Sequence, residues 1–135
     1  MRRRPVFDRW VEKIEFTDTC WLWTASLQDG YGRVWNENTM LLAHRYGYEI
    51  LVAPIPESLT LDHLCRNRRC VNPDHLEPVS LKENILRGEG KGAKNAVKTH
   101  CPKGHEYTDA NIRQGRMMKY GYRQCRICHN AWKAD

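Results

Sequence analysis

The sequence predicts an α+β protein with a main core up to about residue 87, a basic linker at residues 88–99 and a small cysteine- and histidine-rich module at residues 100–135. Three observations lead to this fold class. Helical and strand patterns alternate through the first part of the chain. The linker is rich in glycine and lysine, which is typical of a flexible connection. Cysteines and histidines gather in two groups, one on each side of that linker.

Size and charge narrow the class of protein. The chain has 135 residues, with 22 Lys and Arg against 16 Asp and Glu, and a net charge of +6. A chain of this length buries limited apolar surface, so metals or cross-links are a common supplement. The basic balance favours a polyanionic partner such as nucleic acid, although many soluble proteins are mildly basic.

The six cysteines favour metal binding over disulfides. No apolar segment follows the arginines at residues 2–4, and no stretch of about 18 apolar residues occurs. We therefore expect an intracellular protein that is neither secreted nor inserted in a membrane. Cysteines in that compartment bind metal more often than they form disulfides. A secreted disulfide scaffold is the less favoured alternative.

Local patterns predict the first elements. An amphipathic helix is expected over residues 5–16, where the apolar residues would share one side. A strand then begins at residues 20–23. Asp29–Gly30 is a hairpin turn signal, and residues 31–35 form the returning strand. A second helix is expected from Met40 to Leu51.

The last part of the core is predicted to be strand, loop, strand and helix. Leu59–His63 is a short apolar strand, and a second short strand is expected around Leu76–Val79. Ser80 and Glu83 form a capping box, in which the serine caps the start of a helix. That helix carries Asn84 in its first turn.

Cys65, Cys70 and His75 recur at every fifth residue. Neither a helix nor a strand places such positions on one face, whereas a loop wrapped around one ion does. Zinc requires four tetrahedral ligands, and Cys20 is the remaining cysteine before the linker, so it is assigned as the fourth. The expected site is a closed, structural Cys3His zinc centre. The alternatives are buried free thiols and a core histidine, or a role for His75 in orienting a neighbouring active site.

Zinc on these four residues would leave His63 free beside the site, directly after Asp62. A strand that ends in Asp-His, a loop, a return strand and a helix with Asn84 would form a ββα layout. This layout would gather an imidazole, a carboxylate and an amide around one divalent ion. An Asp-His pair alone is common and carries little weight.

The segment from Asp62 to Asn84 resembles the HNH nuclease superfamily, in the form found in phage HNH proteins and His-Cys box homing endonucleases. The run HLCRNRRCVNPDHL, residues 63–76, matches that superfamily's histidine, its paired cysteines and its Asn-Pro-x-His-Leu motif. The gap from His75 to Asn84 matches as well, and the resemblance covers roughly residues 20–88. It implies a ββα-metal (HNH/His-Me finger) core held together by zinc.

The resemblance also implies a mechanism. His63 would be the general base that takes a proton from the water attacking a DNA phosphodiester. Asn84 would bind Mg2+ or Mn2+ through its side-chain oxygen, and Asp62 would be a second ligand of that ion. Many relatives have an asparagine that orients the base at the middle position of the motif. This chain has His75 there, so one orienting group fewer is expected.

The C-terminal module contains a second candidate zinc site. Cys101-Pro-Lys-Gly-His105 resembles a zinc knuckle, and Cys125 and Cys128 supply a C-x-x-C pair at the start of an expected helix. Residues 106–124 suit a β-hairpin. This order of elements resembles a treble clef or zinc ribbon, with His105 as the fourth ligand.

Arginines provide candidate contacts to the DNA backbone. Arg45 lies in an Ala-His-Arg run that the family often carries, and Arg66 projects from the first zinc loop. A clamp on the phosphates would give salt-dependent, mostly non-specific affinity. An ordinary solvated surface, or packing and surface ion pairs, is the competing interpretation. The candidates are Arg45, Arg66, Arg113, Arg116 and Arg123.

The leading hypothesis is an HNH-type endonuclease of the phage or homing type that hydrolyses double-stranded DNA with one divalent ion. A phage-encoded protein of this kind would act in the host cytoplasm. One active site per chain would require a homodimer, or two successive nicks by a monomer, to cut both strands. The alternative is a non-catalytic zinc-dependent DNA-binding or regulatory protein. That alternative explains the charge and the cysteines, but not the spacing of Asp62, His63 and Asn84.

Overall fold

The computed structural model describes residues 3–113 and 123–134, and the chain divides into two compact units, residues 1–79 and 80–135. Arg116 and the central part of the hairpin expected within residues 106–124 lie outside the described residues. The expected domain boundaries near residues 87 and 99 stay a prediction. None of the described helices is long and apolar enough to cross a membrane.

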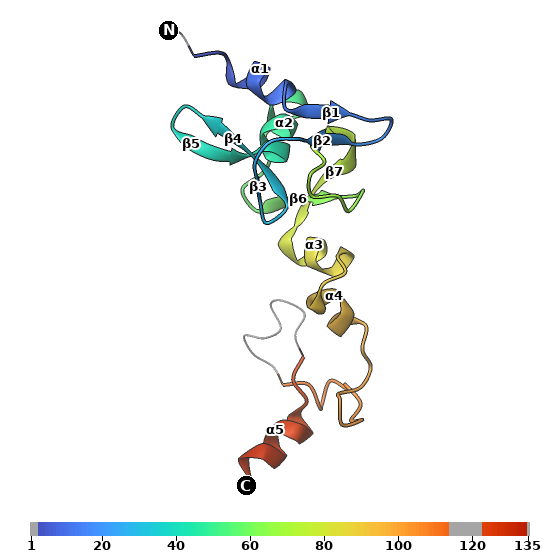
Figure 1. Cartoon of the computed structure of the whole chain (residues 1–135). Coiled ribbons are helices and arrows are strands. Elements are labelled where there is room, and N and C mark those ends of the chain that lie inside the picture. The colour runs from blue at the N-terminus through green and yellow to red at the C-terminus, as the bar shows by residue number, and fades with distance from the viewer. Residues whose placement is uncertain (1–2, 114–122, 135) are drawn as a thin grey trace. The chain divides into compact units, whose positions relative to one another are not determined.

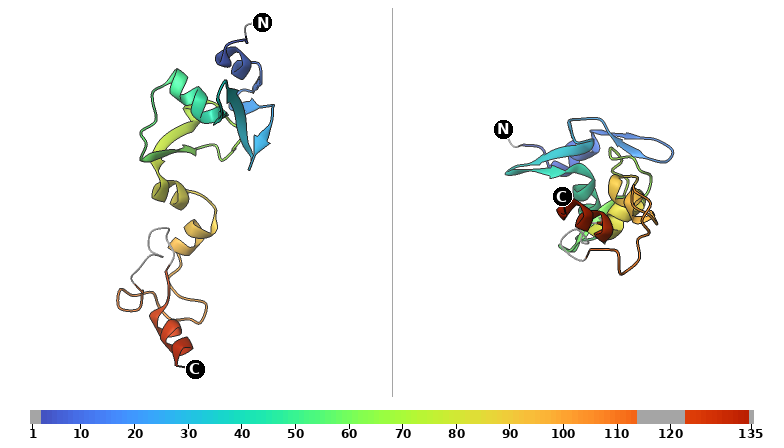
Figure 2. Two further views of the ribbon diagram at one scale, coloured as in Figure 1. Left: turned by 90° about the vertical axis from the view of Figure 1, so that its left-hand side faces the viewer. Right: turned by 90° about the horizontal axis from the view of Figure 1, so that it is seen from below.

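The first unit is built from short helices and short strands (Figure 1). In chain order its elements are α1 (Val6–Val11), β1 (Ile14–Phe16), β2 (Trp21–Trp23), β3 (Leu27–Gln28), β4 (Tyr31–Asn36), β5 (Thr39–Leu42), α2 (Ala43–Leu51), β6 (Leu59–His63), a 3-10 turn (Pro73–His75) and β7 (Leu76–Ser80). β1 pairs with β2, β4 lies between β3 and β5, and β6 pairs with β7. Helix α2 packs against β4 and β5, as the views of Figure 2 show.

The first helix is shorter than the sequence predicts. It ends at Val11, and residues 14–16 form β1, which is antiparallel to β2. The spacing of Trp10 and Ile14 fits one face of a helix, but Ile14 reaches the same core from a strand. The prediction of a helix over residues 5–16 is therefore wrong beyond Val11.

The turn at Asp29–Gly30 is confirmed, but the strand pairing differs from the prediction. β4 pairs with β3 across that turn and with β5 on its other edge, whereas Trp21–Trp23 pairs with β1. Residues 39–42 form β5, so the second helix begins at Ala43 rather than Met40. Asp29 and Gly30 have φ angles of 54° and 84°, as a two-residue hairpin turn of the mirror-image type requires.

The main core of the first unit forms around two tryptophans. Trp10 and Trp23 are 1% and 0% exposed, and the indole N–H of Trp10 donates to the Ala43 carbonyl at 2.8 Å. Gly47 on α2 leaves room for Trp10, because a methyl group there would overlap the indole ring. The core is completed by Ile14, Val34 and Val71. Val71 comes from the loop that bears the cysteines, so the core anchors that loop.

A smaller apolar cluster supports the strands that carry the candidate active-site residues. Leu61 on β6 and Leu76 on β7 are buried against Ile55. Leu61 directly precedes Asp62 in β6, so this packing fixes the strand on which Asp62 and His63 lie.

The second unit contains α3 (Leu81–Arg87), α4 (Lys91–Ala96) and α5 (Arg126–Lys133). The predicted cap of α3 is confirmed, because Glu83 N donates to Ser80 Oγ at 3.1 Å. The helix expected to begin at the C-x-x-C pair is confirmed as α5, which starts directly after Cys125.

Helix α4 lies within the segment whose composition predicts a linker. A six-residue helix is marginal by itself, because several of its carbonyls lack partners within the helix. Arg123 supplies an external partner by donating to the carbonyls of Asn95, Ala96 and Lys98 at the end of α4. A contact far along the chain therefore stabilises this helix, which local composition does not reveal.

Candidate active site and metal clusters

Four residues of the first unit place their ligand atoms within 4.8 Å of one another: Cys20, Cys65, Cys70 and His75, called here the first cluster. The Nδ1 atom of His75 lies 3.5 Å from the sulfur of Cys20 and 3.5 Å from that of Cys70. The structure therefore brings His75 together with the three cysteines, and this set can hold a metal ion.

Backbone pairing brings Cys20 to the loop that carries the other three residues. Trp23 N donates to the Arg69 carbonyl at 2.9 Å, and Val71 N donates to the Trp21 carbonyl at 2.8 Å. These bonds align β2 with the segment around Cys70. Cys20 immediately precedes β2, so its sulfur reaches the cluster from 45 residues away in sequence.

His63 lies at the end of β6 and is 7% exposed. Its Nε2 atom is 3.1 Å from the carbonyl oxygen of Cys70. A carbonyl can only accept a hydrogen bond, so Nε2 carries the hydrogen and the lone pair of the neutral ring is on Nδ1. Burial lowers the pKa of His63, although the Cys70 carbonyl and Asp62 act in the opposite direction. The imidazole is therefore neutral near pH 7 and able to accept a proton.

A second histidine packs against His63. The ring centroid of His44, on α2, lies 4.7 Å from that of His63, and Tyr31 lies 5.4 Å and 5.8 Å from the two histidine rings. His44 is 4% exposed, and its Nδ1 atom is buried without a hydrogen-bond partner among the described residues. Burial, with smaller contributions from His63 and Arg45, lowers the pKa of His44 to about 3. His44 lies in the Ala43–His44–Arg45 run, but nothing in that run indicates a contact with His63.

Asp62 precedes His63 and is 2% exposed. Its Oδ1 atom accepts a hydrogen bond from Nη1 of Arg66 at 2.6 Å, in an ion pair. The Arg66 side chain is 44% exposed, so the pair joins a buried carboxylate to a cation at the surface. Asn84 lies on α3, in the other unit, and its place beside Asp62 and His63 stays a prediction.

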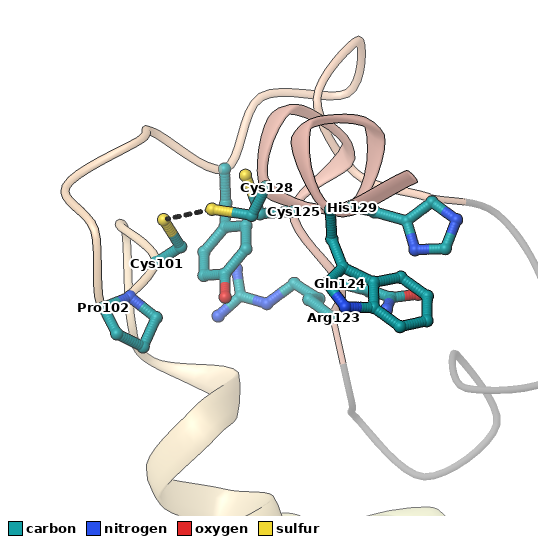
Figure 3. A pocket seen from close by; sticks show the side chains of 9 residues that line it. Cys101, Pro102, Arg123, Gln124, Cys125, Cys128 and His129 are labelled. Atoms are coloured by element: carbon teal, nitrogen blue, oxygen red, sulfur yellow. Dashed lines mark hydrogen bonds between the residues drawn. The ribbon is translucent and has the colours of Figure 1, made fainter. Parts of the chain in front are cut away.

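The second unit contains a matching set, the second cluster: Cys101, His105, Cys125 and Cys128, with ligand atoms within 4.8 Å of one another. His105 Nδ1 lies 3.4, 3.7 and 3.2 Å from the sulfurs of Cys101, Cys125 and Cys128, respectively. The sulfurs of Cys101 and Cys128 lie 3.8 Å apart (Figure 3). The knuckle prediction is consistent with Gly104, whose φ of 85° allows His105 N to donate to the Cys101 sulfur at 3.3 Å.

Asn111 is a buried polar residue beside the second cluster that sequence patterns did not reveal. Its Nδ2 atom donates to the Cys125 sulfur at 3.4 Å and to the Glu106 carbonyl at 2.7 Å. Its Oδ1 atom accepts from Ile127 N at the start of α5 at 3.1 Å. Asn111 therefore connects the residue after the knuckle, the sulfur of Cys125 and the last helix. An isolated asparagine carries no spacing signal, which explains why sequence alone missed it.

The candidate DNA-binding arginines have different environments. Arg113 donates to the Gln124 side chain at 2.7 Å, and Arg123 is bound to the end of α4 with its guanidinium 4.7 Å from the Tyr107 ring centroid. Arg45 is half-buried on α2 and Arg66 is paired with Asp62. Internal partners therefore engage three of these arginines, and their contact with DNA stays a prediction.

All six cysteines are among the described residues and are free thiols. A disulfide scaffold is therefore not the arrangement that the structure adopts. Instead the cysteines divide three and three between the two clusters.

Comparison with known proteins identifies the class. Residues 41–86 match the HNH endonuclease family. Protein 2.8 of Escherichia phage T7 is 32% identical over 106 residues, which cover 76% of this chain and 68% of that protein. Protein 7.7 of the same phage is 35% identical over 68 residues, 50% of this chain and 52% of that protein. A protein named as the uncharacterized gene 5.3 protein of Enterobacteria phage T3 is 33% identical over 66 residues, 44% of this chain and 65% of that protein.

The chain belongs to the HNH endonuclease family. The resemblance drawn from the Asp62–Asn84 segment is confirmed by this match, and the relatives are phage proteins. The chain spans about half the length of protein 7.7. No solved structure matches the chain.

Proposed function

We propose that this protein is a metal-dependent DNA endonuclease that hydrolyses phosphodiester bonds of double-stranded DNA. The observation that carries the proposal is the state of His63: a buried, neutral imidazole whose Nε2 is held by the Cys70 carbonyl, with Asp62 next to it in the chain. A fixed base of this kind, within a family of endonucleases, suits proton abstraction from water.

The chemistry assigned to the chain is an in-line hydrolysis. Nδ1 of His63 accepts a proton from a water molecule, whose oxygen forms a bond to phosphorus. The bond between phosphorus and the 3′ oxygen breaks, and the leaving oxygen takes a proton from a water molecule, which leaves a 5′-phosphate and a 3′-hydroxyl. The Cys70 carbonyl and the Asp62 carboxylate both favour the protonated form of His63 that results.

Asp62 and Asn84 would hold the catalytic ion. A carboxylate and an amide oxygen are hard donors, which fit Mg2+ or Mn2+ better than a thiophilic metal. That ion, when bound, neutralises charge that develops on the phosphate and the leaving oxygen. Asp62 lies next to the base in the first unit, and Asn84 lies in α3 of the second unit.

Zinc is the metal that we assign to both Cys/His clusters. Tetrahedral zinc with Zn–S bonds of about 2.3 Å and Zn–N bonds of about 2.0 Å places two sulfurs about 3.8 Å apart and a sulfur and a nitrogen about 3.5 Å apart. The first cluster has two S–N distances of 3.5 Å, and the second has an S–S distance of 3.8 Å. These distances and the three-thiol donor sets support two structural zinc sites, the second in a treble-clef or ribbon-like module.

The phage relatives support a phage or homing type of endonuclease, acting on DNA within the host cell. One base per chain means that a monomer nicks one strand, and that a homodimer or two successive nicks cut both. Basic residues of the two units, Arg45, Arg66, Arg113, Arg116 and Arg123 among them, would contribute salt-dependent contacts to phosphate.

Incubation of supercoiled plasmid with the zinc-loaded protein tests the proposal. We expect Mg2+ or Mn2+ to convert supercoiled plasmid into nicked and linear forms, and the zinc-loaded protein to leave the plasmid intact when both ions are omitted. DNA binding without any cleavage under all metal conditions would contradict the proposal. That outcome would instead support the non-catalytic DNA-binding alternative.

A further inference from the structure

The ion pair between Arg66 and Asp62 joins residues of very different exposure. Asp62 is 2% exposed and its position is fixed by β6, whereas 44% of the Arg66 side chain is in solvent. A carboxylate taken out of water is costly unless cations or hydrogen bonds compensate its charge. Arg66 supplies part of the compensation for the Asp62 charge in this structure, and a bound cation can take over that part.

The pair is part of the turn between the active-site strand and the first cluster. Arg66 N donates to the His63 carbonyl at 3.0 Å, and Arg66 has a φ of 59°, in the left-handed region. A side chain other than glycine or asparagine adopts this conformation at a cost. The turn reverses the chain directly after His63. It therefore allows Arg66, four positions after Asp62, to reach back to the Asp62 carboxylate.

We propose that Arg66 is an exchangeable counter-ion: it neutralises Asp62 in the metal-free protein and moves to a DNA phosphate when a divalent cation takes the carboxylate. This inference rests on the proposed function, because it assumes that Asp62 is a ligand of the catalytic ion. Arg66 and the cation compete for the same carboxylate, and their like charges repel. A guanidinium that is largely exposed on one side can reach a phosphate, for which its geometry is suited.

The exchange couples DNA binding to metal binding. DNA draws Arg66 away from Asp62 and so raises the affinity for the cation, and the cation raises the affinity for DNA by the same factor. The protein would therefore bind its catalytic ion weakly until a phosphate backbone is in place. This arrangement makes loading of the active site dependent on the substrate.

Mn2+ binding to the zinc-loaded full chain, followed by electron paramagnetic resonance of free Mn2+, tests this coupling. Without DNA, Arg66→Gln should bind Mn2+ about fivefold more tightly, or better, than the wild type, the lower end of typical coupling between sites. A short DNA duplex should tighten Mn2+ binding to the wild type and leave Arg66→Gln nearly unchanged. The duplex arm uses a His63→Ala background in both proteins so that the DNA stays intact.

Arg68→Gln is the matched control. It removes the same charge from the same loop, and the hydrogen bond that Arg68 donates is to the Asp29 carbonyl at 3.1 Å. We expect it to change Mn2+ affinity much less than Arg66→Gln does. Zinc content and thermal unfolding identify any variant that has lost its fold.

Asp62→Asn separates failure of this inference from failure of the proposed function. One outcome would overturn the counter-ion role of Arg66 but leave Asp62 as the proposed metal ligand. In that outcome Asp62→Asn loses Mn2+ binding, whereas Arg66→Gln binds Mn2+ as the wild type does or more weakly. Unchanged Mn2+ binding in Asp62→Asn would overturn both, because Asp62 would then not be a ligand. Tighter binding in Arg66→Gln with loss of the DNA effect supports the exchange.

Discussion

The first and second clusters offer the same donor set, three sulfurs and one imidazole, in different surroundings. The first adjoins a packed core through Val71, and backbone hydrogen bonds connect its loop to β2. The second lies in a unit whose described residues bury Asn111 and two of the cluster's own cysteines, but no other side chain. The first cluster therefore supplements an apolar core. Among the described residues of the second unit, the second cluster replaces an apolar core.

This difference indicates two roles for the same kind of metal site. Structural zinc contributes about 10–16 kcal/mol of apparent binding free energy in small domains, which is enough to fold a unit that lacks an apolar core. In the first unit the tryptophan core already supplies stability. There the metal ion would instead fix the loop whose Cys70 carbonyl orients His63.

The largest expected effect is loss of the second unit's fold when its metal is lost. Cys101→Ser removes one of four ligands, so zinc binding should weaken by orders of magnitude and the unit should unfold. We expect amide hydrogen exchange to lose protection in residues 99–113 and 123–134 while the strands of the first unit stay protected. Retained protection in a variant shown to lack zinc would mean that the second cluster does not replace a core.

The matching change in the first cluster should affect activity more than folding. Cys70→Ser should release the metal and disorder the loop that holds His63, which would lower the nicking rate by about 100-fold or more, the usual contribution of a general base. The tryptophan core should remain, as fluorescence of the buried indoles during thermal unfolding can show. A normal nicking rate in the metal-free variant would contradict this role.

The support around the second cluster should matter less than its ligands. Asn111→Ala removes the hydrogen bond to the Cys125 sulfur and should weaken zinc binding by about 10–100-fold, as loss of residues that support metal ligands usually does. Chelator competition at the second cluster measures this, with Asn130→Ala, an exposed position on α5, as the control. Equal zinc affinity in the two variants would mean that Asn111 does not support zinc binding at the second cluster.

The smallest expected effect concerns the pH dependence of the first unit. The pKa of His44 is lowered to about 3 by burial, so below pH 6.5 the unfolded chain binds a proton that the folded unit does not. This one residue should therefore lower the free energy of unfolding by about 1 kcal/mol between pH 6.5 and pH 5.5. His44→Phe keeps a ring at this position and should lack this contribution. Parallel stability curves for the two proteins would contradict the assignment.

Much of the site could be predicted because its signals are local in sequence. The five-residue spacing of Cys65, Cys70 and His75 predicts one loop around one ion, and the C-x-x-C pair predicts a second site at a helix start. The structure groups these residues as the spacing predicts. The cap of α3 by Ser80 was equally local.

Contacts made by tertiary packing could not be predicted in the same way. The Cys70 carbonyl that holds His63 and the packing of His44 on His63 depend on how α2, β6 and the loop come together. The wrong prediction at Ile14 has a similar origin. A buried residue four positions after Trp10 fits one face of a helix, but pairing with β2 places Ile14 in a strand. Asn111 forms its contacts only after the second cluster has formed.

The role of His63 as general base is tested most directly by the single-turnover nicking rate of His63→Ala with Mg2+, both zinc sites filled and DNA binding unchanged. A general base held by the Cys70 carbonyl predicts a rate at least about 100-fold below that of the wild type. A His63→Ala protein that nicks plasmid at the wild-type rate would contradict the account, because His63 would then not be the base.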